Sequence, residues 1–159
     1  MGDMGTGDMG TPLTAGNLKC LVVDDHAMMR KVAIEIMVSL GFKAENIDQA
    51  EDGAIADQKL TANLKGGTPQ FQIVFLDWTM PGISGYNLLQ QCRQRKEFDN
   101  IAFAMMTAET EKSEVIKALQ AGATSYIQKP YTRADFQEKL VAILKWLTSR
   151  RSKNTQPSK

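Results

Sequence analysis

Five short apolar segments alternate with helical patterns between residues 18 and 147. Three of them, residues 18–23, 73–76 and 101–106, are continuously apolar, which is typical of parallel strands that are covered on both faces. Residues 46–50 and 125–127 are shorter and complete the set. The pattern therefore predicts five strands.

Apolar residues at helical spacing lie between these segments. Met29, Val32, Ile36 and Leu40 form one stripe, which Gly41 ends as a C-terminal cap. A shorter stripe and a final helix follow, marked by Val115 and Leu119 before Gly122, and by Phe136, Leu140, Leu144 and Leu147. Five strands alternating with five helices predict an α/β fold with a doubly wound parallel sheet, and right-handed crossovers place helices on both of its faces.

Both ends of the chain lack such periodicity. Residues 1–17 contain five glycines, and residues 149–159 are basic and carry no acid. We therefore expect a flexible N-terminal arm (1–17), one folded domain (18–148) and a flexible basic tail (149–159).

Composition narrows the functional class. Hydrophobic residues make up 43% of the 159 residues and charged residues 23%, which is typical of a globular domain. With a net charge of +1, the chain has no global field for nucleic acid or an anionic membrane. No apolar run resembles a membrane span or a signal peptide, so we expect a cytoplasmic protein.

The cysteines and the histidine limit the chemistry further. Cys20 and Cys92 form no metal-binding pattern and are expected to be reduced, buried thiols, with a disulfide between them as the alternative. His26 is the only histidine, so the sequence offers almost no candidate residues for an imidazole-based zinc site or for Ser-His-Asp catalysis. We expect His26 itself to be an exposed loop residue.

Polar residues follow four of the five predicted strands. Asp24 and Asp25 come after the first, Asp77 after the third, Thr107 ends the fourth and Lys129 closes the fifth. Taken singly, each has an ordinary structural explanation, such as a helix cap, a turn or a solvated charge. Together they should meet, because ligands of open parallel sheets bind beyond the carboxyl ends of the strands.

The residue types suggest what this group binds. Two unit charges 4 Å apart repel by about 4 kcal/mol at an effective dielectric constant of 20, so three carboxylates disfavour an empty site. Oxygen ligands favour a hard cation, and Mg²⁺ is the natural candidate. A carboxylate can attack phosphorus to form an aspartyl phosphate, while a lysine and a hydroxyl neutralise the phosphoryl oxygens.

Five segments in order, LVVDD, AEDG, LDWTMPGISG, MTAE and AGATSYIQKPYT, resemble the motifs of receiver domains of two-component response regulators. Within that family they are most similar to the stand-alone chemotaxis regulators of the CheY group. The resemblance covers residues 18–147 and implies a flavodoxin-like sheet with strand order 2-1-3-4-5.

The resemblance implies roles at the acidic end of the sheet. Asp77 would be the phosphoacceptor, and Asp25 and Asp77 would be direct Mg²⁺ ligands. Asp24 would act through a metal-bound water and Thr79 through its backbone carbonyl.

The remaining implied roles concern signalling. Thr107 would be the switch hydroxyl and Lys129 the counter-charge of the phosphoryl group, with a cis bond to Pro130. Tyr126 would be the switch aromatic, which turns inward when Thr107 moves. The expected partner-binding face comprises Lys112, Val115, Tyr126 and Lys139.

Two positions and one segment bear on how closely the chain follows this pattern. Thr79 stands where the chemotaxis regulators carry an amide side chain, whereas Glu109 keeps their residue type. In the family these two positions flank the path of the hydrolytic water, so both are expected to tune dephosphorylation. Residues 61–70 should form a longer loop away from the site.

The implied function is that of a single-domain response regulator, expected to be monomeric. Its expected partners are a CheA-like histidine kinase, a downstream protein such as the flagellar motor switch, and a phosphatase. Only twelve residues follow Leu147, so we expect no DNA-binding output domain. We expect no enzyme activity beyond phosphorylation and dephosphorylation of the chain itself.

Three alternatives stay open. The first is an intermediate receiver in a phosphorelay or stress-signalling pathway that is not linked to the motor. The second is a Mg²⁺-dependent phosphatase or phosphotransferase, although Thr79 stands where such enzymes commonly carry a second acid. The third is flavodoxin-like electron transfer, which the two acids after the first strand disfavour because they would repel a flavin phosphate.

Overall fold

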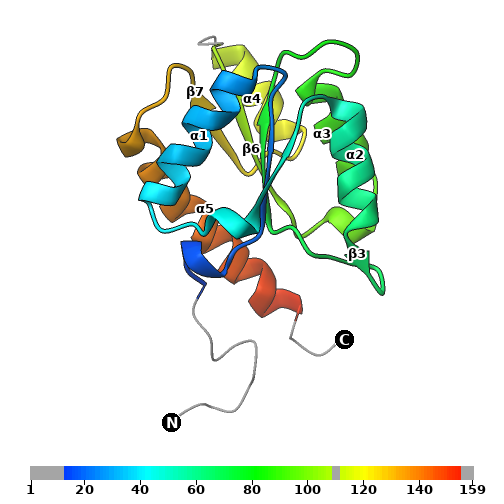
Figure 1. Cartoon of the computed structure of the whole chain (residues 1–159). Coiled ribbons are helices and arrows are strands. Elements are labelled where there is room, and N and C mark those ends of the chain that lie inside the picture. Colours follow the sequence, from blue (N-terminus) through cyan, green and yellow to red (C-terminus); the bar gives the residue numbers. More distant parts are fainter. Residues whose placement is uncertain (1–12, 109–111, 155–159) are drawn as a thin grey trace.

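A five-stranded parallel sheet forms the centre of the molecule in the computed structural model, which describes residues 13–108 and 112–154 (Figure 1). Its strands, in the order β2-β1-β5-β6-β7 across the sheet, comprise Ile47–Ala50, Cys20–Val23, Ile73–Asp77, Ala102–Thr107 and Ser125–Gln128. All neighbouring pairs are parallel. The predicted strands and their order are confirmed.

Five α-helices cover the two faces of the sheet (Figure 1). They are α1 (Ala27–Ser39), α2 (Gly53–Ala62), α3 (Gly85–Arg93), α4 (Lys112–Gln120) and α5 (Arg133–Asn154). Side chains of α1 and α5 pack into one hydrophobic core, and those of α2, α3 and α4 pack into the other. Short 3₁₀ turns at Ala15–Asn17, Ala44–Asn46 and Lys96–Phe98 complete the helical structure.

Strand β1 shows why the apolar runs are continuous. All four of its residues are buried, because Cys20 and Val22 point into the first core while Leu21 and Val23 point into the second. A sheet covered on both faces thus needs apolar residues at every position of a central strand. Cys20 and Cys92 are free thiols buried in different cores, in agreement with the expected reduced state.

The predicted apolar stripes of the helices agree less well with the structure than the predicted strands do. In α1 the fully buried residues are Ala33 and Met37, and the predicted stripe lies only half-buried beside them. Leu119 of α4 was expected to face the core but is 48% exposed, whereas its neighbour Ala118 is buried. The expectation for Leu119 was wrong, because α4 approaches the sheet through its smallest side chain.

Arg93, at the end of α3, connects several loops below the second core. Its guanidinium donates hydrogen bonds to the carbonyl oxygens of Phe98, Ile101 and Gly122 at 2.8–3.0 Å. Burial lowers the pKa of Arg93, and the charge of Asp99 opposes that effect. The partly buried side chain therefore ties the main chain of these loops together.

The chain ends are more ordered than expected. Within the segment expected to be a flexible arm, Leu13 and Ala15 pack against the first core. Helix α5 continues to Asn154, beyond the expected domain end at residue 148. At the N-terminal end the core contacts of Leu13 and Ala15 account for the difference, whereas α5 continues past Leu147, its last residue in the core.

Residues 61–70 also depart from expectation. This segment contains a small antiparallel hairpin, β3 (Leu64–Lys65) and β4 (Thr68–Pro69), and is not simply a loop. Gly66 and Gly67 form its turn with φ angles of 57° and 83°, which favour glycine. The hairpin lies away from the carboxyl ends of the strands, as predicted (Figure 1). Across residues 13–108 and 112–154, no helix combines the length and apolarity needed to span a membrane.

Candidate functional site

The polar residues after the strands meet at one edge of the sheet. Asp24 directly follows β1, Asp77 and Thr107 end β5 and β6, and Lys129 directly follows β7. A cavity of about 210 Å³ opens here, lined by His26, Asp77, Thr79, Thr107, Ala108 and Lys129. The convergence predicted from the strand ends is confirmed.

Lys129 joins two of the carboxylates. Its Nζ lies 2.9 Å from Asp24 Oδ2 and 3.1 Å from Asp77 Oδ1. The two carboxylate oxygens are therefore at most about 6 Å apart, although their residues come from different strands. Both carboxylate side chains are almost inaccessible to solvent, so water screens this triad little.

The backbone holds Asp24 and Lys129 in position. Asp24 Oδ1 accepts a hydrogen bond from the His26 amide at 2.9 Å, and the Asp24 carbonyl accepts one from Arg30 at 2.7 Å. The Lys129 amide donates to the carbonyl of Thr107 at 2.7 Å, and the bond from Lys129 to Pro130 is cis, as expected. The main chain of Lys129 is therefore fixed, and this limits where its ammonium group can lie.

Burial and neighbouring charges perturb the two central groups in the same direction. Burial raises the pKa of Asp77, the charges of Asp24 and Asp25 add to the rise, and Lys129 opposes it. Burial alone would lower the pKa of Lys129, but its hydrogen bonds and ion pairs with Asp24 and Asp77 outweigh that effect and raise it. The acids are thus crowded, and Lys129 stays a cation.

Asp25 carries the feature that fits a metal ion. Its Oδ1 atom is buried, and no donor among the described residues makes a hydrogen bond to it. An unpaired buried carboxylate oxygen is costly unless a cation satisfies it. Because the nearest further ligand atoms include oxygens of Asp24, the donor set suits a hard divalent cation.

The turn after β5 explains how Asp77 is supported. Gly85 begins α3 and lies so close to Asp77 that a Cβ atom at this position would overlap the carbonyl oxygen of Asp77. The Gly85 amide also donates to the Trp78 carbonyl at 2.8 Å, and Ser84 caps α3 by accepting from the amide of Asn87. Glycine is therefore required where α3 begins against the main chain of Asp77.

Trp78 directly follows Asp77 and lies outside the triad. Its ring stacks on Tyr86 of α3 with a centroid distance of 5.1 Å, and Lys117 of α4 lies 4.6 Å from the centre of the Tyr86 ring. An aromatic group adjacent to the acidic cluster is thereby connected to α4.

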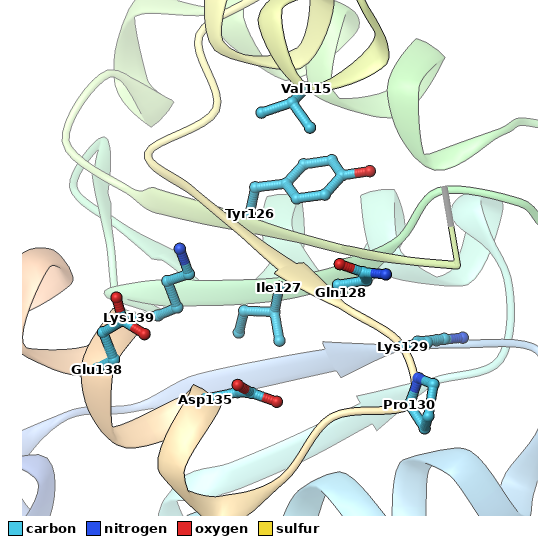
Figure 2. Close-up of a pocket in the computed structure, with 9 residues that line it drawn as sticks. All are labelled: Val115, Tyr126, Ile127, Gln128, Lys129, Pro130, Asp135, Glu138 and Lys139. Atoms are coloured by element: carbon cyan, nitrogen blue, oxygen red, sulfur yellow. The ribbon is translucent and has the colours of Figure 1, made fainter. Parts of the chain in front are cut away.

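A second hollow of about 340 Å³ lies between α4, β7 and α5 (Figure 2). Val115 and Tyr126 face each other on one side, and Glu138 and Lys139 of α5 line the other (Figure 2). We call this hollow the α4–β7–α5 groove. Lys129 lines both the groove and the cavity beside Asp77, so one residue borders the two spaces.

The expected site residues thus fall into three groups. Asp77, Thr107 and Lys129 line the cavity, and Thr79 is exposed on its wall. Asp24 and Asp25 are not lining residues, but Asp24 contacts Lys129 and Asp25 lies beside His26, and Lys129 and His26 both line the cavity. Val115, Tyr126 and Lys139 line the groove, whereas Lys112 is exposed at the start of α4 and is not among the groove residues. Glu109 lies outside the described residues.

His26 is a site residue that the sequence analysis missed. Its side chain is 70% exposed, as expected of a loop residue, but Nδ1 lies 3.3 Å from Asp25 Oδ1 and 3.5 Å from Asp24 Oδ1. The only signal in the sequence is its place directly after the acid pair.

Comparisons with known proteins agree on one family. The family model described as "Response regulator receiver domain" matches residues 20–141. The chain is 39% identical over 131 residues to chemotaxis protein CheY-3 of Vibrio cholerae, covering 82% of this chain and 95% of that protein. It is 38% identical over 127 residues to chemotaxis protein CheY1 of Helicobacter pylori, covering 80% and 97%.

A solved structure with similar architecture comes from Borrelia burgdorferi. It is described as a CheX-CheY-BeF3-Mg+2 complex, and the matched chain is 30% identical with a TM-score of 0.71. The match covers 87% of this chain and 93% of that one.

Proposed function

Because the chain belongs to the response regulator receiver domain family, whose CheY-like members are signalling proteins, we propose that it is a chemotaxis-type switch phosphorylated on Asp77. The proposed phosphoryl donor is a histidine kinase. The observation that carries the proposal is the shared contact of Lys129 with Asp24 and Asp77, beside an unpaired buried oxygen of Asp25.

Asp77 is the proposed nucleophile. One of its carboxylate oxygens forms a bond to phosphorus, and the bond from phosphorus to the donor's nitrogen breaks, with the electron pair leaving on that nitrogen. Lys129 is held as a cation by its two acidic neighbours. Its ammonium group can therefore exchange its ion pair with Asp77 for one with the phosphoryl oxygens. The buried position of Asp77 limits access of water to the product.

Mg²⁺, when bound, would neutralise developing negative charge and so allow an anionic donor to approach the acids. The residues proposed to hold it are Asp24, Asp25 and Asp77, with the carbonyl of Thr79. Asp24 is fully buried and anchored at both its side chain and its main chain, so its oxygen is held ready without rearrangement.

Thr107 and Lys129 are the proposed transmitters. A phosphoryl group on Asp77 offers new acceptor oxygens to both, and Lys129 also lines the α4–β7–α5 groove. We propose that a change in the contacts of Lys129 is transmitted to the groove through this residue, which borders both spaces. Tyr126, half-buried in β7, is the proposed aromatic switch that shifts between two pre-existing positions.

The proposed output surface is this groove, with Val115, Tyr126 and Lys139 as contact residues and Lys112 at its margin. The proposed targets are proteins, the flagellar motor switch first among them. The description of the Borrelia relative as a complex with CheX supports a protein partner. Exposed Ile116 and Leu119 of α4 add apolar surface on the same helix.

Phosphoryl transfer can be tested directly. The purified protein is incubated with Mg²⁺ and a small phosphodonor, and intact mass is measured with and without chelator. We expect one phosphoryl group that requires Mg²⁺ and is absent from Asp77→Asn, while Asp57→Asn, an exposed control acid, is modified normally. Continued labelling of Asp77→Asn would refute the assignment of the acceptor, and sustained turnover of a phosphate ester would favour the enzyme alternative.

The output surface needs a second test. Binding of a purified motor-switch protein is measured with beryllofluoride-treated and untreated protein. We expect tighter binding after treatment, and loss of that gain in Tyr126→Ala and Thr107→Ala. Equal binding in both states would contradict the proposed motor target and favour the phosphorelay alternative. Thr79→Asn, measured by decay of the phosphorylated form, tests the proposed tuning of dephosphorylation, which is also assigned to Glu109.

A further inference from the structure

The imidazole of His26 faces the two acids that precede it in the chain. Nδ1 is 3.3 Å from Asp25 Oδ1 and 3.5 Å from Asp24 Oδ1, and one ligand atom from each of the three residues lies within 4.8 Å of the others. No hydrogen bond joins Nδ1 to either oxygen in the described part of the chain. The nitrogen therefore stands beside the carboxylates without being committed to one of them.

These separations suit a shared metal ion. For a tetrahedral ion with bonds of about 2.0–2.1 Å, neighbouring ligand atoms are about 3.3 Å apart. The two distances from Nδ1 are close to that value, so small side-chain rotations would complete the arrangement. Because the His26 side chain is 70% exposed, such a rotation meets little steric resistance.

Lys129 does not compete for the same atoms. It contacts Asp24 Oδ2 and Asp77 Oδ1, whereas His26 faces Asp24 Oδ1 and the buried, unpaired Oδ1 of Asp25. One side of the acidic cluster is thus occupied by an ammonium group, and the other presents two oxygens and one nitrogen. A nitrogen donor contributes little to Mg²⁺ affinity but favours Zn²⁺, Co²⁺ and Ni²⁺.

We propose that His26 is a metal ligand that makes this site bind borderline divalent cations, Zn²⁺ above all, in competition with Mg²⁺. The inference rests on the proposed Mg²⁺ site and adds a residue that determines its specificity. One consequence is competition between the two ions, because a Zn²⁺ ion held by three adjacent residues would exclude Mg²⁺ from the same oxygens.

The chain is well suited to a clean test. His26 is its only histidine, and both cysteines are buried in separate cores, so no second imidazole and no exposed thiol competes for the metal. Zinc and magnesium chlorides are titrated separately into metal-free protein by calorimetry, with Trp78 fluorescence as a second signal. The variants are His26→Gln and His26→Phe, so that one remains should the other fold poorly.

We expect Zn²⁺ affinity to fall at least about tenfold in both variants, while Mg²⁺ affinity stays within about threefold of the wild-type value. Adding Mg²⁺ should weaken apparent Zn²⁺ binding in the wild-type chain, because the ions share oxygens. A double variant, His26→Gln with Ala27→His, serves as the matched control. It restores an imidazole one residue away, and we expect it not to restore Zn²⁺ affinity.

Unchanged Zn²⁺ affinity in the His26 variants would overturn the inference, as would Zn²⁺ binding that Mg²⁺ does not compete with. An equal loss for both ions would also overturn it, since His26 would then support the acids without selecting between metals. A wild-type chain that binds no Mg²⁺ would instead refute the proposed function, whatever its affinity for Zn²⁺.

Discussion

Replacing Asp77 with asparagine should stabilise the metal-free protein. The folded state holds the Asp77 and Asp24 carboxylates within about 6 Å of each other, because both contact the same ammonium group. Two unit charges at that distance repel by about 3 kcal/mol at an effective dielectric constant of 20. Burial of Asp77 adds to the cost of its charge, whereas Lys129 relieves only part of it because it is already paired with Asp24.

The net gain on Asp77→Asn is therefore expected to be about 1–2 kcal/mol in the free energy of unfolding at neutral pH. For a chain of this length that corresponds to an increase of about 2–8 °C in Tm. The assay is urea unfolding followed by circular dichroism in the presence of a chelator. Asp57→Asn, which removes an exposed partner of Arg95, should change stability by less than about 1 kcal/mol.

The gain should depend on pH in a defined direction. Because the folded-state pKa of Asp77 is raised, its contribution favours the folded state below the unfolded pKa and is lost as pH rises through the folded value. Well below the ordinary aspartate pKa of about 4, Asp77 is protonated in both states and the difference between wild type and variant should shrink. It should reach its full size only at pH values above the raised pKa.

Magnesium should reverse part of this difference. An ion that binds only the folded state stabilises it by about 1.4 kcal/mol at ten times its dissociation constant, and Asp77→Asn removes one proposed ligand. The wild-type chain should therefore gain more from Mg²⁺ than the variant does. An Asp77→Asn protein that is less stable than wild type in chelator at pH 7 would refute the claim that these charges are held together at a cost.

Two further predictions concern the surroundings of the site. Gly85→Ala should lower the free energy of unfolding by about 2 kcal/mol or more and slow phosphorylation, because the added Cβ overlaps the Asp77 carbonyl. Urea unfolding and intact mass test this. Gly16→Ala serves as the control, because a Cβ at that position meets its neighbours only at ordinary contact distance. Arg93→Met should cost about 3–5 kcal/mol, because three carbonyl oxygens lose a charged donor in the interior. A loss below about 1 kcal/mol in the same unfolding assay would show that water replaces the guanidinium.

The positions of the acids could be predicted from sequence because a parallel sheet brings the ends of its strands together. Asp24, Asp77, Thr107 and Lys129 were identified from that rule and meet at one edge of the sheet. The rule depends on topology and strand ends, which continuous apolar runs mark well. It does not depend on side-chain rotamers, which the sequence does not specify.

What the sequence could not show depends on packing between elements. Leu119 and Ala118 are adjacent on α4, and only the distance of this helix from the sheet decides that the smaller residue is buried. His26 was seen as a loop residue because nothing in its neighbourhood specifies that the ring turns toward the acids. Order at Leu13 likewise depends on a contact with the first core that no local pattern encodes.

The two ends of the described chain meet at a place far from the acids. Leu13 and Arg151 line one hollow of about 340 Å³, together with Pro69 of the hairpin, so residues near both ends of the described chain border the same space. Such a chain is a natural candidate for circular permutation, with its old ends joined by a short linker and new ones opened between Gly66 and Gly67. A sensor domain inserted there would leave both the cavity beside Asp77 and the groove unobstructed.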